Sequence, residues 1–136
     1  MKTLMRLVDI AVYLVFLAFA IVVGPHTAAW YVGLFLAAVS VPWWFLARWQ
    51  LGAAFSVTAQ AHRLVTSGVY SRFRHPVYVF GSVGWLGALM VLLGWKAVLI
   101  WAGIVLMEFF RARREERVLE ETFGAEYAAY RDRTWF

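Results

Sequence analysis

Hydrophobic residues fall into four long runs along the chain, at about residues 7–23, 28–49, 76–94 and 95–110. At 1.5 Å per residue, the second and third runs reach about 30 Å, the thickness of the hydrocarbon core of a bilayer. The first run is too long for the core of a signal peptide and has no small-x-small exit site, so we expect it to be a retained span. The pattern predicts an all-α integral membrane protein with four transmembrane helices in one domain, residues 1–136.

The polar segments between the runs differ in length and character. Residues 24–27, Gly-Pro-His-Thr, are typical of a tight turn, whereas residues 50–75 form a long polar connection. The fourth run spans only about 24 Å and enters the charged tail without a glycine or proline. We therefore expect its helix to continue as a C-terminal cytoplasmic helix over about residues 111–123.

Composition and charge agree with a membrane protein. The chain is 63% hydrophobic and has no cysteine, which excludes disulfides, thiolate nucleophiles and cysteine-based metal sites. A net charge of +5 would suggest nucleic acid in a soluble protein, but here its placement suggests topology. Of the 13 lysines and arginines, only Lys96 lies away from the two termini and the long connection, which Arg48 flanks. The positive-inside rule places those three segments in the cytoplasm, with the lipid bilayer and not nucleic acid as partner.

Small residues cluster in the third run: Gly81, Ser82, Gly84, Gly87 and Ala88. In lipid, small residues at such spacing allow helix backbones to approach closely, so tight packing is the main prediction. A groove for a ligand between the packed helices is the alternative.

His75-Pro76 lies where the long connection meets the third run. Proline suits the first position of a helix, because its missing N–H would be unpaired there anyway. We expect His75 at the mouth of this helix, whose first-turn N–H groups favour a negative group such as a carboxylate.

In the tail, Glu108, Arg111 and Glu115 are spaced i, i+3 and i+7, so they share one helix face. By pattern alone, a solvated charged helix with an Arg111–Glu115 pair is the favoured interpretation. Asp9 and Glu108 are acids near the ends of spans, and shallow pairing with arginine accounts for both. With no set of residues at metal-ligand spacing, the residues alone indicate a membrane protein with a cytoplasmic polar site and no metal.

Two segments together resemble the isoprenylcysteine carboxyl methyltransferases and their relatives, which include phospholipid N-methyltransferases. The first reads Leu64-Val65-Thr66-Ser67-Gly68-Val69-Tyr70, then Arg74-His75-Pro76-Val77-Tyr78. The second runs from Arg111 to Glu116, followed by Leu119, Phe123-Gly124, Tyr127 and Tyr130. The resemblance covers residues 62–131 with both motifs in order.

The resemblance implies transfer of a methyl group from S-adenosylmethionine to a lipophilic acceptor in the membrane, leaving S-adenosylhomocysteine, at a site facing the cytoplasm. It assigns Arg111 to positioning the acceptor. The residues that it assigns to the cofactor are His62, Leu64, Val65, Tyr70, Arg74, His75, Pro76, Tyr78, Glu115 and Glu116. Methyl transfer needs donor and acceptor in line and water excluded, which these residue types can provide.

The chain departs from the family pattern at Phe80, where the family has glycine, and it stops short of the usual proline-containing tail. With four spans it is close to a minimal core, so a prenylated cysteine is not assumed as the acceptor. Carboxyl methylation is favoured because Arg111 suits an anion, and phospholipid or amine N-methylation is the alternative. A small four-span transporter using Asp9 or Glu108, and a non-catalytic lipid-binding protein, are the alternatives from other classes.

Overall fold

The computed structural model describes residues 2–52 and 64–136, with side chains from residue 10 onward. This part of the chain is helical and contains no strand, only an isolated bridge between Phe73 and Trp135. The α-helices are α1 (Lys2–Val23), α2 (Ala28–Leu51), α3 (Pro76–Leu93), α4 (Ala97–Phe123) and α5 (Ala125–Arg131). Short 3₁₀ turns lie at η2 (Gly68–Ser71) and η3 (Gly94–Lys96).

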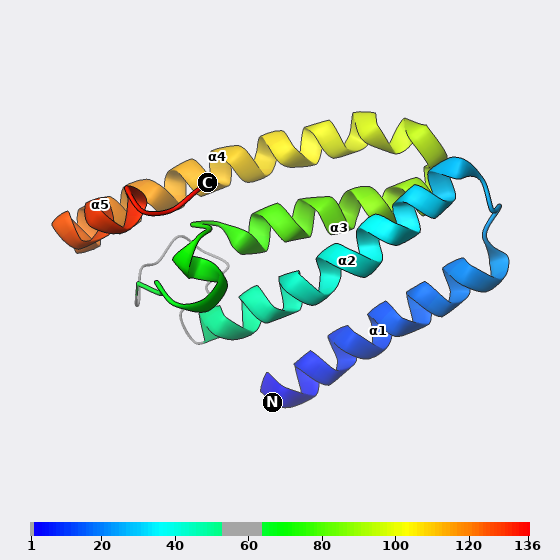
Figure 1. Cartoon of the computed structure of the whole chain (residues 1–136), viewed down its shortest axis with the longest axis horizontal. Coiled ribbons are helices and arrows are strands. Elements are labelled where there is room, and N and C mark those ends of the chain that lie inside the picture. The colour runs from blue at the N-terminus through cyan, green and yellow to red at the C-terminus, as the bar shows by residue number, and fades with distance from the viewer. Residues whose placement is uncertain (1, 53–63) are drawn as a thin grey trace.

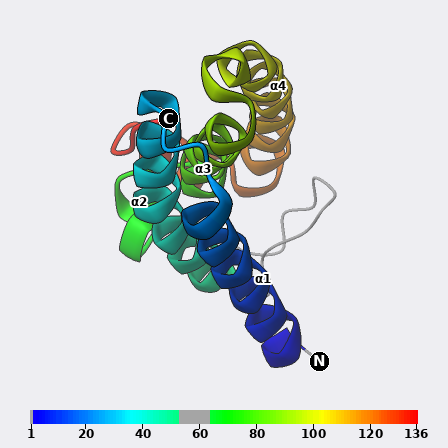
Figure 2. The ribbon, with the colours of Figure 1, turned by 90° about the vertical axis from the view of Figure 1, so that its right-hand side faces the viewer.

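The four long helices run back and forth (Figure 1). Short turns join α1 to α2 and α3 to α4, whereas α3 is entered from the longer segment that contains η2. Thr27 caps the start of α2, since its side chain accepts a hydrogen bond from the amide of Trp30 at 3.3 Å. Figure 2 shows α3 between α2 and α4, with α1 beside α2. Tyr13 joins α1 to α2 by donating a hydrogen bond to the carbonyl of Ala37 at 3.1 Å.

Glycines set the close approach of α2 and α3. A Cβ atom added to Gly87 would lie 2.6 Å from the carbonyl oxygen of Gly33 and 2.6 Å from the amide nitrogen of Ala37. One turn earlier, Gly84 faces Ser40 of α2, and Gly81 faces Trp44. The predicted close packing through small residues is therefore confirmed, and the spacing of three residues keeps all three glycines on the face toward α2.

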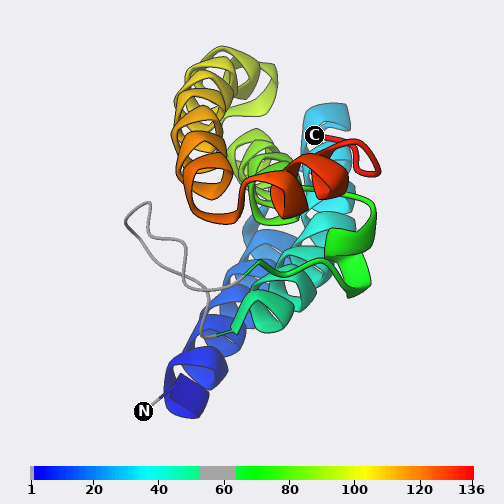
Figure 3. The same cartoon turned by 90° about the vertical axis from the view of Figure 1, so that its left-hand side faces the viewer.

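The C-terminal residues return to the start of α3. Figure 3 shows α5 lying across the end of the bundle, beside the segment that contains η2. Beyond α5, the amide of Trp135 donates to the carbonyl of Arg72 at 2.7 Å, and the amide of Arg74 donates to the carbonyl of Trp135 at 2.9 Å. These two bonds fix the last residues of the chain against the entry to α3.

The helices occupy the four predicted runs, and α4 continues unbroken into the charged tail as expected. Two continuous helical stretches, Ala28–Leu51 and Pro76–Phe123, are long and apolar enough to cross a membrane, and the second folds back at η3. Ile10–Val23 is a shorter apolar helix. Large apolar side chains face outward, among them Leu99 at 81% and Val22 at 79% exposure. Such exposure is typical of a surface that contacts lipid or another protein.

Candidate active site

His75 occupies the N-cap position of α3 without a capping hydrogen bond from its side chain, and Pro76 lies in the first turn of the helix as predicted. The carbonyl of His75 accepts the amides of Tyr78 and Val79, both at 3.0 Å, which closes the first turn. His75 itself is buried at 6% exposure, so the helix start presents the imidazole to neighbouring residues rather than to open solvent.

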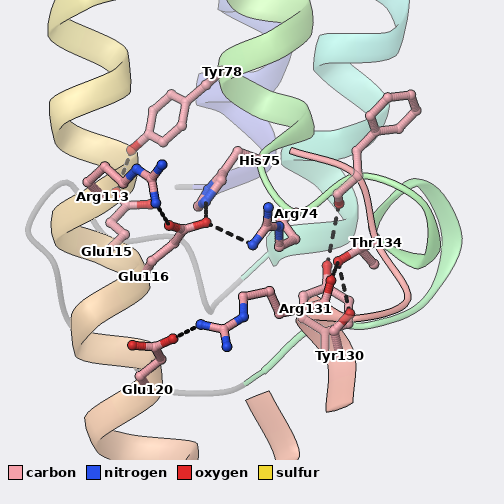
Figure 4. Close-up of polar contacts among 11 residues, drawn as sticks. Arg74, His75, Tyr78, Arg113, Glu115, Glu116, Glu120, Tyr130, Arg131 and Thr134 are labelled. Carbon is pink, nitrogen blue, oxygen red and sulfur yellow. Dashed lines mark hydrogen bonds and ion pairs between the residues drawn. The ribbon is translucent and has the colours of Figure 1, made fainter. Parts of the chain in front are cut away.

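Glu116 is the centre of an ion cluster at this helix start (Figure 4). Its Oε1 lies 3.1 Å from a terminal nitrogen of Arg74 and 3.4 Å from Nε2 of His75, and its Oε2 lies 3.5 Å from Arg113. Because an ionised carboxylate can only accept, Nε2 of His75 is the donor. The hydrogen bond from His75 lowers the pKa of Glu116, and the charges of Arg74 and Arg113 lower it further, against the opposing effect of burial.

Glu115, the neighbouring residue, faces a different set of groups. The Tyr78 hydroxyl donates a short hydrogen bond to its carboxylate, and Nε of Arg111 lies 3.5 Å from the same oxygen. The Arg111 guanidinium also lies over the Tyr78 ring, with Cζ 5.6 Å from the ring centre. Tyr78, Arg111 and Glu115 therefore form one surface between α3 and α4. The predicted shared face of Arg111 and Glu115 is confirmed, and Glu108 lies half-buried on α4 one turn before Arg111.

The segment before α3 is held by apolar packing on one side. Val65 and Tyr70 pack against Ala47 of α2, with Leu51 and Val77 at the edge of this cluster. Burial raises the pKa of Tyr70, and the nearby Glu115 carboxylate raises it further, so its hydroxyl stays protonated.

Two tyrosines of α5 hold the same segment from the other side. The Tyr130 hydroxyl donates to the carbonyl of Tyr70 at 2.7 Å and lies 3.4 Å from the carbonyl of Phe73. Burial raises the pKa of Tyr130 to about 12, so the donor proton is retained at neutral pH. Tyr127 is fully buried, and among the described residues neither its hydroxyl nor Nε of Arg74 has a hydrogen-bond partner.

The last residue, Phe136, covers the imidazole of His75. Its ring centre is 5.6 Å from that of His75 and 6.4 Å from that of Phe109, to which it is nearly parallel. The C-terminal aromatic ring therefore connects the start of α3 to α4 at the edge of the ion cluster.

The structure brings together six of the residues predicted from the resemblance: Arg74, His75, Tyr78, Arg111, Glu115 and Glu116. Pro76 is fully buried behind them, whereas Val65 and Tyr70 turn toward α2, and Leu64 is half-buried. His62 lies outside the described residues. The roles assigned to these positions stay predictions.

Sequence reasoning missed the contributions of Arg113 and Phe136 and the pairing of Glu120 with Arg131. Arg113 could have been found, because it lies three residues before Glu116 on one helix. Phe136 carried no local signal, since its contact depends on the chain returning from α5.

Comparison with known proteins identifies the family of the chain. Residues 27–126 match the family model described as phospholipid methyltransferase, which is well over half of the chain. The chain belongs to the phospholipid methyltransferase family. All of the described residues of the ion cluster and of the Tyr78 surface lie within the matched range.

Curated relatives of this phospholipid methyltransferase family member carry the name protein-S-isoprenylcysteine O-methyltransferase. The protein of Schizosaccharomyces pombe is 39% identical over 89 residues, covering 60% of this chain and 37% of the relative. The human protein is 39% identical over 77 residues, which cover 55% of this chain and 27% of the relative. The protein of Saccharomyces cerevisiae is 43% identical over 75 residues, which cover 53% of this chain and 30% of the relative. The chain thus spans about a third of the length of these relatives. No solved structure matches it.

Proposed function

We propose that this protein is an S-adenosylmethionine-dependent methyltransferase that methylates the carboxylate of a lipophilic acceptor in the membrane. The observation that carries the proposal is the pairing of two motifs 37 residues apart, in which Tyr78 of the first donates to Glu115 of the second. Family membership supports the reaction class, and the names of the relatives support a carboxyl group on a lipidated acceptor.

The proposed setting is a bilayer crossed by all four long helices, with both termini and the site on the cytoplasmic side. The Tyr78 surface and the ion cluster lie at the same end of the bundle as residues 64–75 and the tail. That end carries almost all of the lysines and arginines, as the positive-inside rule requires of a cytoplasmic face. The outward-facing apolar side chains of α1 and α4 supply the lipid-facing surface.

The chemistry of the residues present fits the cofactor. S-adenosylmethionine has a carboxylate that needs donors, and an ammonium group and ribose hydroxyls that need an acceptor. The Arg74 guanidinium beside the start of α3 supplies donors, and the Glu115 carboxylate, with 26% of its side chain exposed, supplies the acceptor. The Glu116 carboxylate already accepts from Arg74, His75 and Arg113, so we propose that it holds those residues in place rather than contacting the cofactor.

When bound, the cofactor supplies an electrophilic methyl group on a sulfonium centre. Methylation of a carboxylate by such a group would yield a methyl ester and a neutral thioether, so no proton would have to be removed. The protein therefore needs no general base, and its task is to place the acceptor in line and exclude water, which is worth about 7–11 kcal/mol. Arg111 can bind the acceptor carboxylate in a bidentate pair of hydrogen bonds. The contacts of Arg111 with Glu115 and the Tyr78 ring orient its guanidinium.

Cofactor binding is tested by titrating the purified full-length protein with S-adenosylhomocysteine in a calorimeter. Wild type should bind, and Glu115→Gln and His75→Ala should weaken binding about tenfold or more, the effect of losing one charge-assisted hydrogen bond. Absence of binding by folded wild type would contradict the proposed function.

Acceptor chemistry is tested with labelled S-adenosylmethionine and membrane lipid extracts. We expect a labelled product from which dilute base releases methanol, because a methyl ester hydrolyses and an N-methyl group does not. Arg111→Ala should lose this transfer while keeping S-adenosylhomocysteine binding, and Arg114→Ala, exposed on the same helix, serves as the matched control. A base-stable label would refute carboxyl methylation and favour the amine alternative.

A further inference from the structure

A groove of about 510 Å³ lies at the cytoplasmic end of α2 and α3, and the proposed chemistry does not use it. One end is polar and is lined by Ser71, Arg72 and Gln50, where η2 sits over the last turn of α2. Gln50 fixes that arrangement, since its side chain accepts the amide of Val69 at 2.8 Å.

The other end of the groove is aromatic. The ring of Phe80 stacks on Trp43, with ring centres 5.9 Å apart and planes 23° apart, and meets the edge of Phe73 at 5.8 Å. Trp43 lies seven residues before Gln50 on α2, which places the rings about 10 Å further along the helix than the polar end. In the proposed topology this direction leads from the membrane surface into the hydrocarbon.

The groove lies on the opposite side of α3 from the candidate active site. Tyr78 and Phe80 are two residues apart, so their side chains point about 200° apart around the helix. Tyr78 faces α4 and Glu115, whereas Phe80 faces Trp43 of α2. A molecule in the groove therefore cannot be the methyl acceptor held by Arg111.

Arg72 gives the groove its charge. Its side chain is exposed, and within residues 2–52 and 64–136 its guanidinium forms no ion pair or hydrogen bond. Three other arginines near the site, Arg74, Arg113 and Arg131, are each paired with a glutamate. A cationic end at the membrane surface and an aromatic end about 10 Å deeper match the layout of an anionic phospholipid, with its phosphate above its acyl chains.

We propose that this groove binds one anionic phospholipid of the bilayer, with the phosphate at Arg72 and an acyl chain along Trp43 and Phe80. The bound lipid packs against η2 and Phe73, whose backbone is held by Tyr130 on its other side. It thereby stabilises the segment that leads into His75. The site depends on the proposed membrane placement but not on methyl transfer.

The test is native mass spectrometry of the full-length protein in detergent, with equimolar phosphatidylglycerol and phosphatidylcholine of the same acyl chains. Wild type should retain one phosphatidylglycerol in preference to phosphatidylcholine. Arg72→Gln should lower phosphatidylglycerol occupancy about fivefold and remove the headgroup preference, and Phe80→Ala should lower retention of both lipids. Arg117→Gln, an equal change of charge at an exposed position outside the groove, should behave as wild type.

Three results would overturn the proposal. The first is that wild type shows no preference between the two lipids, a result that is measured without any variant. Arg72→Gln and Arg117→Gln could lower occupancy equally, which would indicate a general effect of charge. Displacement of the lipid by millimolar inorganic phosphate would indicate a site for free phosphate. None of these lipid-binding measurements uses the cofactor. A protein that retains lipid but binds no S-adenosylhomocysteine would therefore contradict the proposed function and leave the lipid site supported.

Discussion

Replacing Glu116 tests whether the ion cluster organises the start of α3. The Glu116 side chain is 12% exposed and accepts from Arg74, His75 and Arg113, so its removal leaves two buried donor groups without their acceptor. Removing one partner of a fully buried pair typically costs about 3–5 kcal/mol. The Arg74 side chain is 18% exposed, which lets water reach it, and the exposed Arg113 adds little.

We therefore expect Glu116→Ala to lower the free energy of unfolding by about 2–3 kcal/mol. Glu116→Gln keeps the shape and one acceptor oxygen, so its effect should be about 1–2 kcal/mol. The matched control is Glu120→Gln, one turn further along α4, which removes the pair between Glu120 and Arg131. Both side chains of that pair are 45% exposed, so the loss should stay below about 0.5 kcal/mol.

The assay is denaturant-driven unfolding of the full-length protein in mixed micelles, followed by circular dichroism, with S-adenosylhomocysteine titrations of each variant. If Arg74 and His75 contact the cofactor, Glu116→Gln should also weaken binding about tenfold, whereas Glu120→Gln should not. Equal stability of the two glutamine variants would refute the organising role of Glu116.

The same cluster predicts a pH dependence. The pKa of Glu116 is lower in the folded protein than its ordinary value of 4.5, so folding favours the ionised form. The stabilisation is therefore complete above about pH 4.5 and is lost as the pH falls through the lower folded-state pKa. Wild type should lose stability more steeply than Glu116→Gln below pH 4.5, and parallel curves in that range would contradict the cluster geometry.

Two further predictions use the same unfolding assay. Gly87→Ala should destabilise the protein by about 1–3 kcal/mol, because the new methyl group would lie 2.6 Å from backbone atoms of α2. Gly103→Ala is the control, since no atom outside the adjoining backbone of its own helix lies within 4 Å of the added Cβ, and it should be neutral or stabilising by up to about 1 kcal/mol. Tyr130→Phe should cost about 1 kcal/mol or more by leaving the Tyr70 carbonyl without its 2.7 Å donor. Tyr31→Phe, at an exposed tyrosine, should have no measurable effect.

Much of the fold could be predicted because the signals are local. Runs of apolar residues locate the four long helices, and the missing N–H of Pro76 locates the start of α3. The absence of a breaker after Phe110 predicted that α4 continues into the charged tail, and it does so as far as Phe123. The glycines of the third run predicted close packing, although the partner helix was not specified.

The candidate site was only partly predictable. The resemblance named most of the residues that the structure brings together, but it treated Glu115 and Glu116 alike. In the structure Glu115 faces Tyr78 and Arg111, whereas Glu116 faces Arg74 and His75. Adjacent residues on a helix point about 100° apart, so the division between them depends on how α4 is rotated about its axis against α3.

The sequence by itself therefore determined where the helices lie, which end of the bundle carries the charge, and which family the motifs resemble. These properties depend on composition and on spacings of a few residues. The tertiary structure decided which glutamate completes which half of the site, how α5 and Phe136 hold the start of α3, and that Phe80 and Arg72 share a groove away from Tyr78. Each of these depends on how helices far apart along the chain are rotated about their axes and offset along one another. A local sequence pattern does not specify the rotation or the offset.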